Sequence, residues 1–244
     1  MKRMLLTISY DGSAYHGWQV QPNGITVQSV LQDSLEKLIG TRPGVTGCSR
    51  TNAGVHALEF CCHFDCDDSF PEITFVRGLN SVLPKDIAVK DCRRVADDFH
   101  ARYSSKGKQY VYRIYNSAVR DPFKSRYAWQ IERELDIDRM NEFCEKICGT
   151  HDFAVFSASG RTVSDTVRTV SECFVKKEED FILLKITADG FLYNMVRIIA
   201  GTAVGVSDGK ILPSDTDYMF ISGDRSAAGI TAPPNGLFLN KVLY

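Results

Sequence analysis

The feature that most restricts the fold of this chain is its longest apolar run, the 16 residues 191–206. A helix that is apolar on nearly every side has to be buried against other elements. The run is shorter than the roughly 20 residues of a membrane span, and it contains Asn194 and Arg197. We therefore predict a buried helix in a cytoplasmic protein. An unpaired buried guanidinium is costly, so Arg197 should have an anionic partner unless its side chain reaches the surface.

Hydrophobic patterning predicts further strands and helices on the N-terminal side of that run. Alternation predicts strands at residues 4–10, 59–64, 87–89, 108–115, 168–176 and 181–187, and helical spacing predicts helices at 27–39, 75–82 and 138–148. Thr26 and Gly40 are the expected caps of the first helix. This order of elements predicts an α+β protein with two pseudo-duplicated halves, residues 1–104 and 105–244, although no sequence repeat supports a duplication. A cleft between the halves is the expected ligand site.

Net charge does not identify a nucleic-acid binder, because it is −1 with a pI near 6.5. Any such surface has to be local. Residues 100–130 hold seven aromatic side chains and seven cations against the single acid Asp121; the cations are Arg102, Lys106, Lys108, Arg113, Arg120, Lys124 and Arg126. Cations for phosphates and rings for unstacked bases are what single-stranded RNA requires. A solvated strand and loop is the alternative interpretation.

Eight cysteines raise the question of a metal site, but none of them forms a CxxC pair. The candidate ligands are Cys61, Cys62, His63 and Cys66, with His56 nearby. Adjacent residues of a strand point to opposite faces, so the first two could not easily share one ion. Reduced thiols without metal are therefore the prediction.

A glycine-bearing segment, residues 47–57, reads GCSRTNAGVHA. Glycines let the backbone turn sharply and approach a ligand, and Arg50 and Asn52 present polar groups there. Taken alone, the segment is a polar turn. It resembles the motif of TruA-type tRNA pseudouridine synthases, which reads GRTDAGVHA around a catalytic aspartate. Matching family segments follow in order along nearly the whole chain: YDG at 10–12, GWQ at 17–19, QPN at 21–23, TVQ at 26–28, FHAR at 99–102, HDF at 151–153, FLYNMVR at 191–197 and TAP at 231–233.

The resemblance implies the pseudouridine synthase fold, a central mixed and mostly antiparallel sheet flanked by helices, with an RNA cleft between two halves. It also implies a homodimer that acts without cofactor or metal on uridines in the anticodon stem-loop of tRNA. Such an enzyme breaks the bond from uracil N1 to the ribose, turns the base and rejoins it through C5. A base stacked in RNA has to be swung out first.

The resemblance assigns roles to individual residues. Position 52 is that of the nucleophilic or basic carboxylate, Tyr110 stacks on the base and assists loss of the C5 proton, and Arg197 is the partner of the carboxylate. Leu237 forms an apolar wall. The predicted catalytic residues are Asn52, Tyr110 and Arg197, and the predicted substrate-binding residues are Arg50, Tyr110, Leu237, Lys106 and Lys108. For Tyr110 and Leu237, a plain core role is the alternative.

Asn52 departs from the family pattern. It is nearly isosteric with aspartate, but it is neutral, hardly nucleophilic and no base at neutral pH. Since the remaining motif is intact, the sequence favours a variant inactivated by an Asp-to-Asn change. A naturally non-catalytic tRNA-binding homologue or RNA chaperone is the alternative, and a metal or small-molecule enzyme using the Cys/His cluster is a further one.

Overall fold

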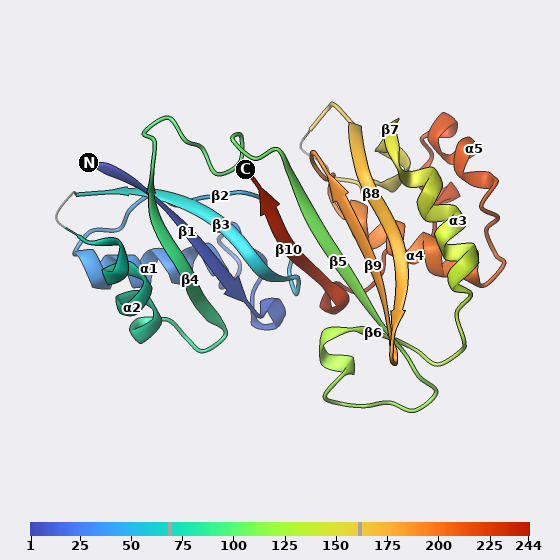
Figure 1. Cartoon of the computed structure of the whole chain (residues 1–244), viewed down its shortest axis with the longest axis horizontal. Helices are drawn as coiled ribbons and strands as arrows, with labels where there is room; N and C mark the ends of the chain where they lie inside the picture. The colour runs from blue at the N-terminus through green and yellow to red at the C-terminus, as the bar shows by residue number, and fades with distance from the viewer. Residues whose placement is uncertain (68–69, 161–162) are drawn as a thin grey trace. The chain divides into compact units, whose positions relative to one another are not determined.

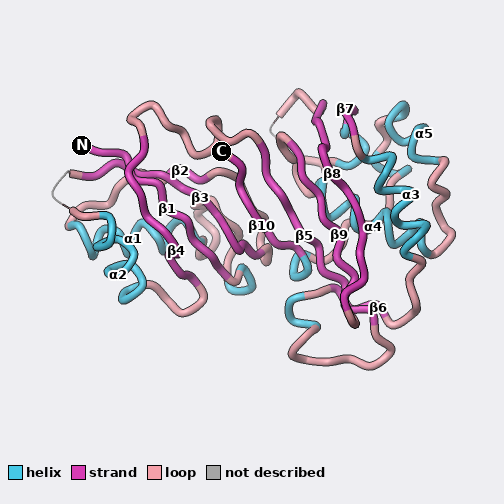
Figure 2. Tube along the Cα trace, viewed as in Figure 1, coloured by secondary structure: helices cyan, strands magenta, loops and turns pink. Residues whose placement is uncertain are grey.

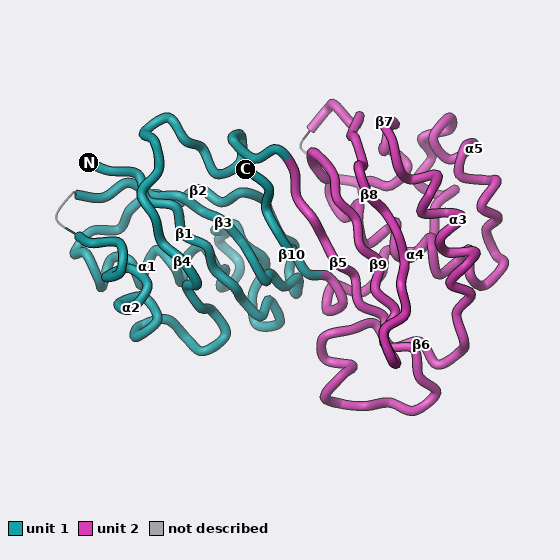
Figure 3. Tube along the Cα trace, in the orientation of Figure 1, with its two compact units in different colours: residues 1–106, 238–244 teal, residues 107–237 magenta. Residues whose placement is uncertain are grey.

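A computed structural model describes residues 1–67, 70–160 and 163–244. The chain forms two compact units, residues 1–106 with 238–244, and residues 107–237 (Figure 3). The last seven residues thus belong to the first unit, whereas the sequence division after residue 104 places them in the second half. The chain builds most of the first unit, then the whole of the second, and returns to complete the first.

The sheet of the first unit is built on β1 (Lys2–Tyr10), which pairs antiparallel with β3 (His56–Cys66) and β4 (Ile87–Val95). The short β2 (Thr46–Gly47) pairs antiparallel with β3, and β10 (Leu237–Leu243) pairs parallel with it. The helices are α1 (Val27–Ile39) and α2 (Glu72–Val82) (Figure 1). Phe75 of α2 packs edge-on against Phe64 of β3, which fastens the second helix to the sheet.

The second unit contains an antiparallel sheet in the order β5 (Gly107–Asn116), β9 (Phe181–Ala188), β8 (Val167–Glu178) and β7 (Gly149–Asp152). A short β6 (Trp129–Ile131) pairs parallel with β5. The helices are α3 (Ile137–Ile147), α4 (Met195–Ser207) and α5 (Asp215–Ser222) (Figure 2). In each unit the strand pairing is mixed and mostly antiparallel, with helices alongside, which confirms the predicted α+β class.

The buried helix differs from its prediction at its start. It begins at Met195, because Asn194 has a left-handed backbone with φ of 61° and cannot continue a right-handed helix. Residues 191–194 belong to the run but are not helical. An apolar run alone therefore does not show where a helix begins. Arg197 consequently lies in the first turn of α4. The helix α5 and the strand β10 were not predicted.

No helix among the described residues has the length and apolar character that crossing a membrane would require.

Candidate functional site

The loop that carries Asn52 is held by the N-terminal segment. The Tyr10 hydroxyl and the Thr51 Oγ1 are hydrogen-bonded at 2.8 Å in the interior. The Trp18 backbone N–H donates to the Thr51 carbonyl oxygen at 3.1 Å. Gly17 has φ of +84°, and a Cβ there would lie 2.4 Å from the same carbonyl oxygen. Only glycine satisfies both the backbone conformation and the close approach, so the residues flanking position 52 are fixed in place.

Asn52 lies in a tight turn within this loop. Its carbonyl oxygen accepts the Val55 N–H at 3.1 Å, and the Gly54 N–H donates to the Tyr15 carbonyl at 3.3 Å. The Asn52 side chain is half-buried, whereas Arg50 is exposed. The backbone of position 52 is therefore anchored while its side chain keeps access to solvent.

The far end of the loop is fastened through His56. The Gly12 N–H donates to His56 Nδ1 at 3.1 Å, and an Asp11 carboxylate oxygen lies 3.1 Å from the same nitrogen. The imidazole stacks on Phe238 of β10 with centroids 4.7 Å apart. The sequence analysis considered His56 only beside the candidate metal ligands and did not predict its contacts with Asp11 and Gly12, although the YDG and GVHA segments were the available signal.

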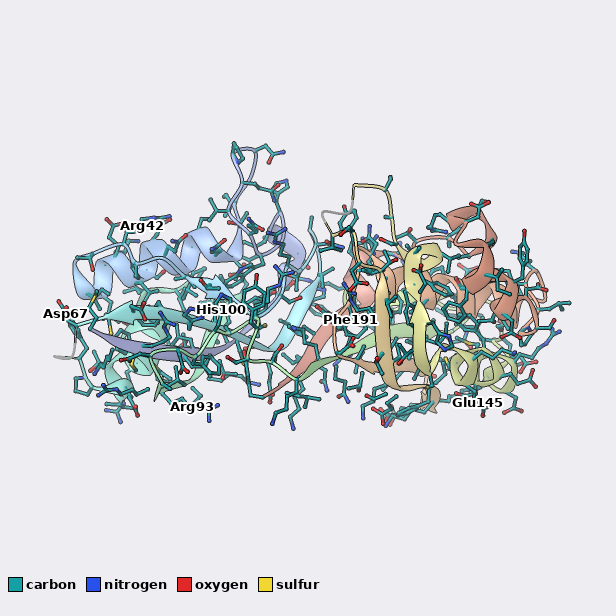
Figure 4. The ribbon with its side chains drawn as sticks, turned by 90° about the horizontal axis from the view of Figure 1, so that it is seen from above. Arg42, Asp67, Arg93, His100, Glu145 and Phe191 are labelled. Carbon is teal, nitrogen blue, oxygen red and sulfur yellow. The ribbon has the colours of Figure 1, made fainter. Side chains whose placement is uncertain are left out.

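Tyr110 lies on β5 in the second unit and is only 5% exposed. Its ring meets Phe191, labelled in Figure 4, edge-to-face at 5.0 Å. Two residues along, the Tyr112 hydroxyl donates to the Pro233 carbonyl at 2.7 Å, and burial raises the pKa of Tyr112 well above its usual range. Tyr110 and Tyr112 are both buried, so their rings are largely removed from water.

Arg197 is half-buried and is held from two directions. Its Nε donates to the Ala232 carbonyl at 2.6 Å and its Nη1 to the Asn194 Oδ1 at 2.9 Å. Burial lowers the pKa of the guanidinium, and the nearby Tyr112 and Tyr193 oppose that shift. Within the described part of the second unit, both hydrogen-bond partners are neutral oxygens.

The remaining predicted residues have contrasting environments. Leu237 is 6% exposed at the start of β10. Lys106 is exposed, with its backbone N–H on the Leu243 carbonyl, whereas Lys108 is 7% exposed within β5. The predicted site residues are divided between the units: Asn52, Arg50 and Lys106 are in the first, and Lys108, Tyr110, Arg197 and Leu237 are in the second.

Comparison with known proteins decides the family. The sequence pattern described as tRNA pseudouridine synthase matches residues 6–104 and 143–244. This chain belongs to the tRNA pseudouridine synthase family. The tRNA pseudouridine synthase A of Thermoanaerobacter sp. strain X514 is 46% identical over 244 residues, and that of Caldicellulosiruptor saccharolyticus is 45% identical. The tRNA pseudouridine synthase A 2 of Clostridium perfringens is 41% identical; each of these alignments covers all of both chains.

The chain therefore has the fold of TruA-type synthases, and it belongs to a family of isomerases. The matched range includes the loop of Asn52 and the start of α4, while Lys108 and Tyr110 lie in the unmatched segment 105–142. The full-length relatives nevertheless align across that segment.

The cysteines of this synthase family member are free thiols, all buried except the half-buried Cys148. Burial raises the pKa of Cys62 well above its usual range. Cys61 and Cys62 are adjacent residues of β3, so their side chains point to opposite faces. The Cys61 Sγ lies 3.9 Å from the Thr7 hydroxyl. Across the described ranges, no group of three or more His, Cys, Asp or Glu side chains is arranged to hold a metal ion.

Proposed function

We propose that the chain binds tRNA in the manner of a synthase that isomerises uridines of the anticodon stem-loop to pseudouridine, and that Asn52 makes this form catalytically inactive. In the reaction, the bond from N1 to the ribose C1′ breaks, a bond from C5 to C1′ forms, and the C5 proton leaves while N1 gains one. No oxidant, metal or other cofactor is needed for that balance.

The proposed roles follow from side-chain chemistry. A carboxylate at position 52 would attack the substrate or accept a sugar proton, and Asn52 can do neither at neutral pH. Tyr110 would stack on the displaced base and assist proton loss from C5. Arg197 would neutralise the carboxylate, whose pKa a positive neighbour lowers.

One observation carries the proposal: the backbone at position 52 is anchored on both sides by Thr51 and Val55. Since Asn and Asp are nearly isosteric, the anchored loop would present a carboxylate where it now presents an amide. Loss of activity would then follow from the chemistry of one side chain, without a change in the loop.

The decisive experiment compares the chain with Asn52→Asp and Asn52→Ala on tRNA transcripts labelled with tritium at uridine C5. Tritium release reports formation of the C5 glycosidic bond, and we expect release only with the Asp form. Equal release by the unchanged chain and by its Asn52→Asp form would contradict the role proposed for a carboxylate at position 52. An Asp form that binds tRNA without turnover would favour the alternative, a naturally non-catalytic tRNA-binding homologue or RNA chaperone.

The proposal includes a substrate, an assembly state and a location. An isolated anticodon stem-loop should compete with whole tRNA for binding, whereas an acceptor-arm hairpin should not.

The chain should be a homodimer, so sedimentation should give about twice its mass of 27.3 kDa. It should act in the cytoplasm. A monomer at assay concentrations would contradict the predicted dimer without affecting the chemistry.

A further inference from the structure

Two residues other than glycine have positive φ within the described chain, Glu179 at 52° and Asn194 at 61°. This left-handed conformation strains an L-residue, and such strain gathers at functional sites. Glu179 lies in the two-residue turn between β8 and β9, where hairpins favour positive φ. Asn194 is in no hairpin, so its conformation requires another explanation.

Asn194 is the N-cap residue of α4 without capping it through its side chain. An asparagine at this position commonly accepts a backbone N–H of the first turn, which stabilises the helix. Here its Oδ1 accepts the Arg197 Nη1 hydrogen at 2.9 Å instead. The residue therefore combines backbone strain with the loss of a common capping bond, and its side chain holds Arg197.

A second contact holds the same guanidinium. The Arg197 Nε donates to the Ala232 carbonyl at 2.6 Å, and the Ala232 N–H returns a bond to the Arg197 carbonyl at 3.1 Å. These contacts use two of the five N–H donors of a planar guanidinium and define its plane. Three guanidinium donors remain beyond these two contacts, and Arg197 is only half-buried.

We propose that Asn194 is a positioning residue that fixes the guanidinium plane of Arg197, so that its remaining N–H groups meet the anionic partner used in catalysis. The inference rests on the proposed function, which makes that partner the carboxylate at position 52. An Arg197 free to rotate would be a poorer partner, because productive geometry is easily lost by small displacements.

The experiment uses Asn194→Gly, with Glu179→Gly as the matched control. Both changes relieve positive φ, so both should keep or raise stability in urea. Only Asn194→Gly removes the acceptor. In ¹⁵N spectra of the full chain, rotation of the Arg197 guanidinium should become faster in Asn194→Gly, and stay restricted in Glu179→Gly. Asn194→Asp keeps an acceptor and should restore the restriction.

The catalytic readout uses the same variants with Asn52→Asp. We expect Asn194→Gly to lower kcat/KM by about 10- to 100-fold, and to move the acid limb of its pH profile upward as the carboxylate loses its partner. Glu179→Gly should change neither. If Asn194 had only a structural role, Asn194→Gly would change the free energy of unfolding and would leave the acid limb of the pH profile in place.

Two outcomes would overturn the inference: a guanidinium that stays restricted in Asn194→Gly, or one that rotates freely while kcat/KM is kept. If Asn52→Asp is itself inactive, the proposed function fails, and the guanidinium spectra alone decide whether Asn194 positions Arg197. The two failures are thereby distinguished.

Discussion

At the scale of single residues, Gly17 meets two restrictions at once in its contact with the loop. Gly17→Ala would face both φ of +84° and a Cβ placed 2.4 Å from the Thr51 carbonyl oxygen. Gly40 is a matched control, with φ of +77° and nothing within 4 Å of an added Cβ. Gly40→Ala should cost only the conformational strain, about 1 kcal/mol. Gly17→Ala should cost more in urea unfolding and should also impair turnover in the Asn52→Asp background; equal effects would show that the loop adapts.

His63 predicts a pH dependence of stability. Burial, with the nearby charges of Arg3 and His100, lowers the pKa of His63 to about 4, and its Nδ1 accepts the Ala101 N–H at 3.1 Å. The unfolded chain protonates this group below about 6.5, whereas the folded chain resists protonation until pH 4. Stability should therefore fall as pH falls from 6.5 to 4, by about 2 kcal/mol between pH 7 and 5.

The variant His63→Asn isolates that contribution. Its side-chain oxygen can still accept the Ala101 N–H, but it does not titrate. Urea unfolding at pH 7 and pH 5 should therefore show a smaller difference than in the unchanged chain. An undiminished difference would assign the pH dependence to other groups.

At the scale of elements, local rules predicted most of the fold. The helix Val27–Ile39 has the predicted bounds because its Thr26 cap and Gly40 stop act within the chain segment itself. The predicted start of α4 was wrong because Asn194 has a left-handed backbone, which an apolar run does not reveal. β10 was missed because its parallel pairing with β3 joins residues 182 positions apart (238 − 56 = 182), beyond any local pattern.

The candidate site could be predicted only in part. Motifs identified Asn52, Tyr110 and Arg197, but not the support supplied by Tyr10, Gly17 and other distant residues. Such support depends on which segments fold together. Composition could not separate Lys106 from Lys108 either, although one is exposed and the other is buried in β5. The roles of all these residues in catalysis and binding stay predictions.

The basic, aromatic segment 100–130 yields a test with exposed cations. The double variant Lys106→Ala with Arg126→Ala should weaken tRNA binding. The slope of log binding constant against log salt should also become shallower by about one to two units, because fewer phosphate contacts release fewer counterions on binding. Lys108 is left unchanged because it is buried. Lys37→Ala with Arg77→Ala, on α1 and α2, makes the same change of charge at exposed positions. Identical salt slopes for the two double variants would exclude the segment as a specific RNA surface.

At the scale of the whole molecule, the chain passes from the first unit to the second and then returns to the first. The first unit is complete only when β10 returns from residue 238 onward to pair with β3. Phe238 then stacks on His56, and the Tyr244 hydroxyl donates to the Ala101 carbonyl at 2.8 Å. The stability of the first unit therefore depends on residues that follow the whole of the second unit along the chain.

This coupling can be measured by truncating one ring. Phe238 is 5% exposed, so Phe238→Ala should destabilise the protein by about 3 kcal/mol. Phe123 is 90% exposed, and the same truncation there should change stability by less than about 0.5 kcal/mol. Hydrogen exchange locates the effect: amides of β1 and β3 should lose protection in Phe238→Ala, while those of β8 and β9 keep theirs. If all four strands lose protection equally, the two units unfold as one, and β10 stabilises the entire chain.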